Sequence, residues 1–569
     1  MSIATERTFA PPGPGTWFLD PTHFTRPVTR FHAEIFIEEM HRGFGESLRR
    51  YGSLLERLDW AFVNGFCYYH PQPLGAPPDA TDHPPREVWE RLAADHPEIR
   101  TRLATSATVF ERKLWREDLC RWDEEVRPGL QRERRELQQV EPGLLDTGSL
   151  LAYLDRCREH QRRAGYLHHL FNMPALLPMG DLLAHCQEWT GRTTGEILAP
   201  LAGSSPDPLA DREELAELAA AVAADPRASE LLASPARPQE VLAALGAVAG
   251  RTSTALAEYL ESAGWRPVNG EDVGDPCVAE LPAVVLAAIR SAVSSSTRPQ
   301  AADARADQCA DAAADLRAAV PAPHRSRFDE LLAEARLVSR LRDERGSCAD
   351  LPAIGLTRRA ILAAGRRLTE QGRIYAPAHL AEAGYAELRA LVRTGSGPDA
   401  AELAARAHYR DHARYADAPP MLGPPPGDPL PPDWLPPAAA RLERALGAIV
   451  LAMFSNPAAR TEGRTVHGLG ASPGVYEGTA RVISGVPEFD RIQPGDVLVT
   501  GATTTAFNIV LPLLGAIVTD RGGALSHAAI VAREFAIPGV VGCTDATAVI
   551  PDGAWVRVDG RAGEAAVVR

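Results

Sequence analysis

A proline-rich segment places the strongest constraint on how this 569-residue chain can fold. Between Pro419 and Pro437, ten of nineteen residues are proline. Proline lacks a backbone N–H and fixes φ, so no helix can run through this stretch, which should be extended and semi-rigid, as in polyproline II. We therefore expect a linker at residues 416–437 that separates two parts of the chain.

The sequence before this linker has the pattern of helices. Apolar residues recur at helical spacing with charged residues between them, and the alternation typical of strands is hard to find. The pattern is clearest at residues 30–58, 211–224, 327–345 and 356–371. We expect residues 1–415 to form a mainly helical region, interrupted by a turn cluster at residues 203–208 and by a loop or mobile arm that begins near Ser294.

The sequence after the linker changes character. A helix and a hinge are expected at residues 438–465, with the hinge near residues 455–466. Short β-branched runs then alternate with glycine turns, at residues 478–483, 496–500, 515–519, 539–542 and 555–559. One helix, from about His527 to Ala536, interrupts these runs. Residues 466–569 thus predict a compact, β-rich α/β domain that can move on its hinge.

Composition excludes several classes of protein. The formal net charge of −14 disfavours general binding to nucleic acid or to an anionic membrane. Lys113 is the only lysine among 60 basic residues, and its surroundings fit neither a Walker A loop nor the lysine strand of a protein kinase. The eight cysteines are scattered, so neither a metal site nor a disulfide framework is predicted. Without a recognisable signal peptide or membrane span, we expect a cytoplasmic protein.

The segment with the clearest chemistry surrounds His527. A buried strand leads into the Gly522-Gly523 turn, Ser526 is a suitable N-cap, and His527 follows in the first turn of a helix. The unpaired N–H groups and positive dipole end at that position disfavour imidazolium and can receive phosphate oxygens. A lone histidine is usually a capping or packed residue, but these surroundings favour a histidine that accepts and hands on a phosphoryl group.

Residues 519–542 read Thr-x-x-Gly-Gly-x-x-Ser-His-Ala-Ala-Ile-x-Ala-Arg-Glu-x-x-Ile-Pro-x-Val-Val-Gly. This stretch resembles the phosphohistidine signature of the phosphoenolpyruvate-utilising enzymes, which include phosphoenolpyruvate synthase, pyruvate phosphate dikinase, rifampin phosphotransferase and phenylphosphate synthase. Residues 470–474 and 494–500 are similar to earlier parts of the same domain. The resemblance implies a swivelling β/β/α domain in which His527 is phosphorylated. The residues expected to support it are Thr519, Gly522, Gly523, Ser526 and Arg533.

Three short stretches resemble the substrate-binding region of the rifampin phosphotransferase type. They are residues 17–29, 160–174 and 268–282. In this region His168 is a candidate substrate-side base and Glu280 a candidate pocket carboxylate, although each also fits a structural role, as a packed histidine and a helix-start residue. The basic run of Arg336, Arg340, Arg342 and Arg345 fits either a phosphate grip or a solvated, salt-bridged helix face.

One part of the family pattern is missing from the sequence. No part of the sequence has the strand-rich pattern of an ATP-grasp nucleotide-binding domain. No part has the alternating strands and helices of a barrel that binds phosphoenolpyruvate. The resemblance to phenylphosphate synthase, whose functions lie on separate subunits, implies an ATP-grasp partner that holds ATP and Mg²⁺, with no cofactor or metal on this chain. The expected function is transfer of the phosphoryl group from His527 to a small hydroxyl-bearing acceptor bound in the helical region. The alternative is a non-catalytic phosphocarrier or regulatory binding protein that uses the same histidine.

Overall fold

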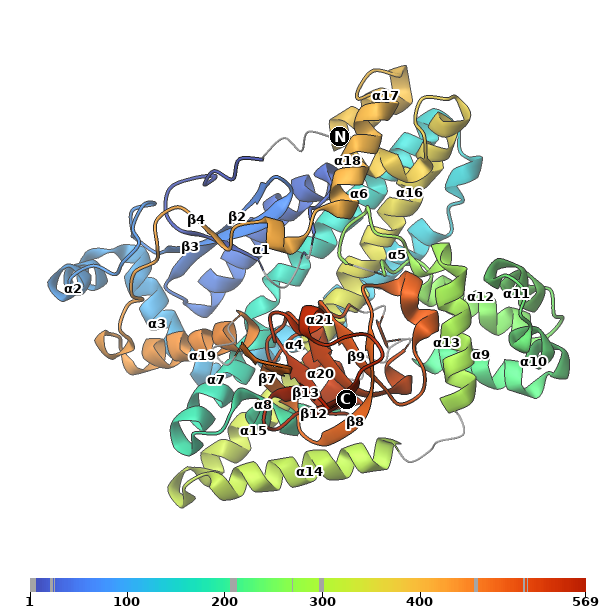
Figure 1. Ribbon diagram of the computed structural model, residues 1–569. Helices are drawn as coiled ribbons and strands as arrows, with labels where there is room; N and C mark the ends of the chain where they lie inside the picture. Colours follow the sequence, from blue (N-terminus) through green and yellow to red (C-terminus); the bar gives the residue numbers. More distant parts are fainter. Residues whose placement is uncertain are drawn as a thin grey trace. The chain divides into compact units, whose positions relative to one another are not determined.

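A computed structural model describes residues 7–20, 24, 26–204, 212–268, 270–295, 301–454, 459–504, 507–508 and 510–568 (Figure 1). The chain divides into two compact units, each made of separate stretches. Unit 1 comprises Met1–Leu177, Glu271–Gly274 and Glu344–Leu446, and unit 2 comprises Pro178–Gly270, Asp275–Asp343 and Gly447–Arg569. The compact unit that contains His527 is therefore larger than the C-terminal stretch alone.

Unit 1 is built mainly of helices. They are α1 (Arg30–Tyr51), α2 (Arg86–Asp95), α3 (Pro97–Arg112), α4 (Leu114–Arg121), α5 (Arg127–Gln138), α6 (Thr147–Leu170), α16 (Leu351–Glu370), α17 (Tyr385–Thr394) and α18 (Ala400–His412), and α7 (Asn172–Thr190) and α19 (Pro437–Phe454) begin here. Two π-helical segments, η1 (Trp122–Val126) and η7 (Arg345–Asp350), lie between α4 and α5 and before α16. Phe31, Leu154 and Ile361 mark the core between α1, α6 and α16. Within the described ranges, no helix combines the length and apolarity needed to cross a membrane.

Unit 1 also holds a four-stranded sheet that the helical pattern did not predict. Its order is β2-β3-β1-β4, from β1 (Trp17–Leu19), β2 (Leu55–Val63), β3 (Phe66–Pro73) and β4 (Met421–Leu422). The expected helix at residues 30–58 is wrong at its end, because α1 stops at Gly52 in the left-handed conformation. The signal that predicts the hairpin is Asn64-Gly65, whose φ values of 52° and 81° suit the tight turn between β2 and β3.

The proline-rich segment is extended over most of its length, with a 3-10 helical turn at Pro432–Trp434, and it is fixed along unit 1. Its β4 pairs with β1, and Leu422 is buried. The Thr16 hydroxyl donates to the Pro424 carbonyl at 2.7 Å, and the Gly427 N–H donates to the Thr81 carbonyl at 2.6 Å. These contacts make the segment a part of the packed unit.

Unit 2 combines helices with one large sheet. The helices are α8 (Thr194–Leu198), α9 (Arg212–Ala224), α10 (Pro226–Ala233), α11 (Pro238–Gly246), α12 (Arg251–Ala263), α13 (Pro282–Ser295), α14 (Ala301–Ala319), α15 (Arg325–Glu344), α20 (His527–Glu534) and α21 (Ala546–Val549). The expected turn cluster and loop lie in part outside the described residues, at 205–208 and 296–300. The alanine-rich sequence after them forms α14 and is not a loop.

The large sheet has nine strands in the order β5-β6-β13-β12-β8-β9-β10-β11-β7. They are β5 (Arg460–Glu462), β6 (Thr465–His467), β7 (Leu469–Ser472), β8 (Val475–Val482), β9 (Asp496–Thr500), β10 (Leu514–Thr519), β11 (Gly539–Val541), β12 (Trp555–Asp559) and β13 (Glu564–Val567). Alternate residues of the central strands face opposite sides: Leu498, Ile517 and Val541 pack under α20, and Val499 and Val518 pack with β12 and α21. The five strand runs and the helix at His527 that the sequence predicted are confirmed.

The structure describes only part of the hinge expected at residues 455–466, and that part is a hairpin. Residues 455–458 lie outside the described residues, whereas β5 and β6 form a hairpin within the large sheet. Gly463, in its turn, has a φ of 64°, which proline cannot adopt. A Gly463→Pro substitution, which would be the obvious way to stiffen a hinge, would therefore break this hairpin.

Candidate active site

His527 lies at the carboxyl edge of the parallel strands of unit 2. The pairs β8–β9, β9–β10 and β10–β11 are all parallel, so the segments that follow β9 and β10 emerge at the same edge. The segment after β10 carries the Gly522-to-His527 turn, and the segment after β9 carries Thr503 and Asn508. Parallel sheets generally bind their ligands at this edge, because helix N-termini and loops converge there.

The turn before His527 has the geometry that the sequence predicts. Ser526 is the N-cap of α20, in extended backbone geometry, and its Oγ accepts from the Ala529 N–H at 3.4 Å. Gly522 has a φ of 120°, which L side chains rarely adopt. A Cβ on Gly523 would lie 2.2 Å from the Ala452 carbonyl oxygen, so only glycine fits between the turn and α19. His527 is thereby fixed as the first residue of the helix.

Both ring nitrogens of His527 have partners within unit 2. Nδ1 lies 2.8 Å from the Thr503 hydroxyl, and Nε2 lies 2.9 Å from Oδ1 of Asn508. A carboxamide oxygen accepts hydrogen bonds, so this arrangement places the ring proton on Nε2 and lets Thr503 donate to Nδ1. The ring is only partly buried, and its orientation is fixed by two side chains from the neighbouring loop.

Two arginines bind consecutive carbonyls of the same turn. Arg533, which is buried on α20, donates to the Ala471 and Ala524 carbonyls at 3.0 and 2.8 Å. Arg342, at the end of α15, donates to the Leu525 carbonyl. In the described part of the chain Arg342 has no ion-pair partner, although Asp343 lies close enough to influence its charge. Two positively charged side chains, Arg533 and Arg342, therefore bind the backbone of the turn before His527.

The electrostatic surroundings keep the imidazole neutral. Burial, and then the charge of Arg342, lower the pKa of His527 from 6.5 to about 4. Burial and the same arginine lower the pKa of Arg533 to about 10, so this side chain stays charged at neutral pH. A neutral ring retains a lone pair on one nitrogen, which is what a nucleophile requires.

The other residues singled out in the sequence have different surroundings. Thr519 is buried at the end of β10, where its hydroxyl donates to the Arg521 carbonyl at 2.7 Å, so it shapes the turn. Glu280 accepts from the Cys277 N–H at 2.9 Å, which is the helix-start role considered for it. His168 lies in unit 1, where it forms an ion pair with Asp350. In the described residues, no group of three or more His, Cys, Asp or Glu side chains is arranged to hold a metal.

Thr503 and Asn508 are site residues that the sequence motif does not predict. Neither belongs to the glycine-histidine motif, and both lie more than 18 residues before His527 in the sequence. The available signal was topological: two successive strands followed by loops predict that both loops meet at one sheet edge. Arg342 was visible only as one member of a basic run, because its direction depends on how α15 packs.

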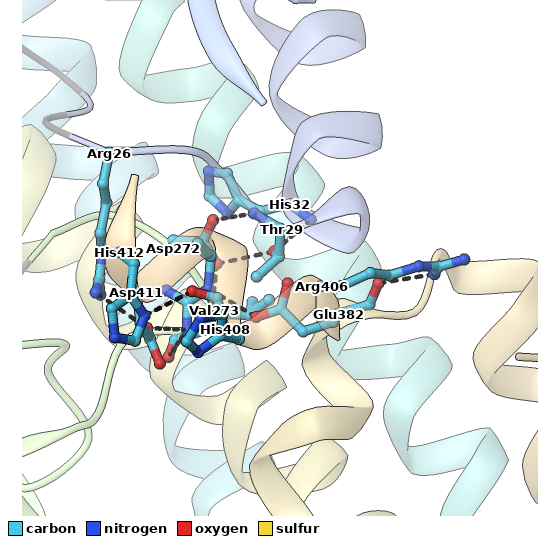
Figure 2. A network of polar contacts seen from close by, with 12 residues as sticks. Arg26, Thr29, His32, Asp272, Val273, Glu382, Arg406, His408, Asp411 and His412 are labelled. Carbon is cyan, nitrogen blue, oxygen red and sulfur yellow. Dashed lines mark hydrogen bonds and ion pairs between the residues drawn. The ribbon is translucent and has the colours of Figure 1, made fainter. Parts of the chain in front are cut away.

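The stretch at residues 268–282 is divided between the two units. Its segment Glu271–Gly274 is built into unit 1, where the buried Asp272 carboxylate accepts from the Thr29 N–H at 2.7 Å and the Thr29 hydroxyl at 2.8 Å (Figure 2). Arg410 donates to the Gly274 carbonyl at 3.1 Å and to Glu382 at 2.7 Å. Burial raises the pKa of Asp272, but the charges of His32 and Arg410 and the backbone hydrogen bonds outweigh it and lower the pKa overall. The network is an anchor for this segment.

Two parts of the chain match known protein families. Residues 492–563 match the family of the PEP-utilising enzyme mobile domain, and residues 168–343 match the fourth domain of rifampicin phosphotransferase. The first match contains His527 with its turn, and the second contains Arg342. These two segments are similar to the mobile domain of PEP-utilising enzymes and to a domain of rifampicin phosphotransferase, the two kinds of protein that the sequence resembled.

Individual relatives cover different parts of the chain. A probable phosphoenolpyruvate synthase of Archaeoglobus fulgidus is 48% identical over 96 residues, which are 17% of this chain and 13% of the relative. An uncharacterised phosphotransferase of Bacillus subtilis, YvkC, is 29% identical over 314 residues, which are 55% of this chain and 36% of the relative. An uncharacterised protein of Mycobacterium tuberculosis is 43% identical over 115 residues, or 20% of this chain and 13% of the relative. The chain thus spans about a third or less of the length of the curated relatives it matches.

Proposed function

We propose that this chain carries a phosphoryl group on His527 and transfers it to the hydroxyl of a small organic acceptor bound in the helical region. The donor would be ATP held, with Mg²⁺, on an ATP-grasp partner. The observation that carries the proposal is the arrangement at His527: a neutral, oriented imidazole at a helix N-terminus, with the charge of Arg342 behind it. The matches to the mobile domain and to rifampicin phosphotransferase support it.

The surroundings of the ring favour both gain and loss of a phosphoryl group. Because the imidazole is neutral, its lone pair is available at physiological pH without prior loss of a proton. Thr503 and Asn508 hold the two ring nitrogens, so a donor has to displace one of them, and the other keeps the ring in line with the phosphorus. The side chain that keeps its hydrogen bond orients the ring both when the phosphoryl group is gained and when it is lost.

Arg342 is suited to bind the phosphoryl oxygens. A guanidinium has five N–H donors in a rigid fork that matches phosphate, and Arg342 uses one contact on the Leu525 carbonyl. A partly buried cation without an ion-pair partner is costly until an anion arrives. A phosphoryl dianion on His527 would provide that anion. Phosphorylation of His527 would therefore offset the cost of burying the charge of Arg342.

The test is labelling of the chain with radioactive phosphate, either from ATP with an ATP-grasp partner or from phosphoramidate as a chemical donor. The label should be acid-labile and base-stable. His527→Ala should abolish it, whereas His467→Ala, which removes a buried histidine of the nine-stranded sheet in the same unit, should not. Full labelling of the His527→Ala variant would overturn the assignment.

The same assay separates the proposed enzyme from the alternative phosphocarrier. An enzyme should release a phosphorylated small molecule when an acceptor hydroxyl is supplied to the labelled chain. A carrier should pass the label only to another protein. Release of label solely in the presence of a protein acceptor would favour the carrier.

A further inference from the structure

The strand β2 forms one edge of the four-stranded sheet of unit 1. It is nine residues long, it pairs with β3 on one side, and no other strand of the described residues pairs with it. The N–H and C=O groups along such an edge are a template for pairing with another chain, and folded proteins usually block them. A nine-residue edge therefore needs side chains that take the place of a neighbouring strand.

The register of the β2–β3 hairpin shows which groups of β2 point to this edge. Val63 and Phe66 flank the two-residue turn, and such a pair exchanges its backbone hydrogen bonds inside the hairpin. Ala61, opposite Tyr68, repeats that arrangement two residues earlier. Because successive residues of a strand alternate, Trp60 directs its N–H away from β3 and toward the edge.

Two side chains from neighbouring helices bind backbone groups of β2. At its first residue, Arg102 of α3 donates to the Leu55 carbonyl at 2.8 Å. In the middle, the Trp60 N–H donates to Nε2 of His41, which lies on α1, at 2.8 Å. An arginine donates at every physiological pH, whereas a histidine nitrogen accepts only while it is unprotonated. The middle of the edge is thus closed by a group that can titrate near neutral pH.

A carboxylate lies ready beside the same ring nitrogen. Asp59 Oδ1 is 3.6 Å from Nε2 of His41 and is also paired with Arg57 at 2.7 Å. The side chain of His41 keeps 32% of its accessible surface, so a proton can reach it from water. Burial has the largest influence and lowers the pKa of His41 below 6.5, while Asp59 raises it and Arg57 lowers it. The ring is therefore neutral at pH 7 and gains its proton in mildly acidic solution.

The other charged groups of this region lie on α1 and on α6, which packs against it. They are paired with each other, each pair at 2.6 Å or 2.8 Å: Glu38 with Arg162, Glu39 with Arg162, and Glu39 with Arg42. Asp59 is therefore the carboxylate that a protonated His41 would meet.

We propose that His41 is a pH-sensitive cap of the sheet edge, an inference that does not depend on the proposed function of His527. While neutral, the ring accepts from the Trp60 N–H and closes the middle of β2. When a proton from solvent binds to Nε2, the lone pair is lost, the hydrogen bond to Trp60 breaks, and the imidazolium turns to Asp59. The Trp60 N–H is then open to water or to the backbone of an extended chain.

Hydrogen exchange of the purified full chain, read residue by residue with mass spectrometry at pH 7 and pH 5, tests this cap. The Ala61 N–H faces β3 and serves as the internal reference. After correction for the intrinsic effect of pH, protection of the Trp60 N–H relative to Ala61 should fall about tenfold at pH 5, as expected for one lost hydrogen bond. Relative protection that is the same at both pH values would overturn the proposal.

Variants of the two side chains distinguish the cap from a general effect of acid. His41→Gln keeps an acceptor at every pH, so protection of Trp60 should stay high and independent of pH. His41→Ala should lower it about tenfold already at pH 7. Asp59→Asn should move the loss of protection to lower pH, because a neighbouring carboxylate favours the imidazolium.

A matched control is a second histidine of unit 1 that accepts a backbone N–H. His96 is the N-cap of α3, and its Nδ1 accepts from the Ile99 N–H at 3.3 Å. His96→Gln should leave the pH response of Trp60 unchanged, and thermal melting should confirm that all variants are folded. A response in His41→Gln equal to that of the wild type would refute the assignment, because another group would then control the edge.

Discussion

A single neighbouring charge influences both states of His527. Arg342 contacts the turn two residues before the ring and, after burial, is the second cause of the lowered pKa of the imidazole. The same positive charge would stabilise a phosphoryl dianion on the ring. One side chain can thus favour the neutral nucleophile before transfer and the anionic product after it.

The pKa of His527 provides a direct test at this scale. Nuclear magnetic resonance titration of the ring should give a value near 4 in the wild-type chain, and Arg342→Gln should raise it part of the way toward 6.5, because burial remains. Arg342→Lys keeps the charge and should shift it little. A wild-type value near 6.5 would contradict the electrostatic account.

This lowered pKa also makes stability depend on pH. Between pH 6.5 and about 4 the unfolded histidine takes up a proton that the folded one rejects, so the free energy of unfolding should fall as the pH drops through this window. Above pH 6.5 the contribution is absent. His527→Gln should show a smaller decline in chemical denaturation at pH 5 than the wild type does.

At the scale of elements, a strand, a glycine turn and a helix N-terminus place the histidine. Gly522 accepts a φ that other residues avoid, Ser526 caps the helix, and Gly523 permits contact with α19. The π segments of unit 1 act in a comparable way, since each one turns two side chains toward a shared partner. In both places an irregular backbone positions side chains that a regular helix would direct elsewhere.

The contact of Gly523 with α19 predicts a specific cost. In Gly523→Ala the new methyl would meet the Ala452 and Met453 carbonyl oxygens at 2.2 and 2.6 Å, and backbone atoms cannot rotate away. We expect a loss of about 1–3 kcal/mol in the free energy of unfolding. Gly447→Ala, in α19 with nothing within 4 Å of the new methyl, is the control and should be neutral or stabilising. Equal stability of Gly523→Ala and the wild type in urea would argue against this packing.

At the scale of the molecule, the domain that contains His527 shares a core with the helical sequence before it. Val268 and Val284 are buried in one cluster with Phe489, Phe507 and Leu511. Withdrawing such side chains into water costs about 1.5–3 kcal/mol each, so the packed arrangement is a stable resting state of unit 2. We propose that transfer to an acceptor requires this contact to open or the moving body to include these helices.

The proposal that a partner, and not this chain, binds ATP can also be tested at this scale. The purified chain should bind ATP weakly and should not consume it, because its one lysine, Lys113, lies in no phosphate-binding motif. Isothermal titration calorimetry with ATP and Mg²⁺ measures this directly. Micromolar binding, or release of AMP by the chain alone, would contradict the need for a partner.

The sequence by itself determined the C-terminal fold and predicted the central residue of the candidate site. Local signals suffice there, because a strand, two glycines, a cap and a helix follow each other within twenty residues, and each depends on its own backbone preferences. The helices of residues 1–415 were predictable for the same reason. The β2–β3 hairpin carried a local signal in Asn64-Gly65, but the helical pattern that surrounds it concealed the two strands.

Only the tertiary structure decided which distant residues join His527 and His168. Thr503 and Asn508 reach the ring from one loop, Arg342 reaches the turn before it from a helix 185 residues earlier in the chain, and Asp350 approaches His168 from 182 residues away. Such contacts depend on strand order, on helix packing and on π turns that rotate side chains. None of these leaves a mark in the spacing of the residues concerned, because each is set by the shape of its neighbours.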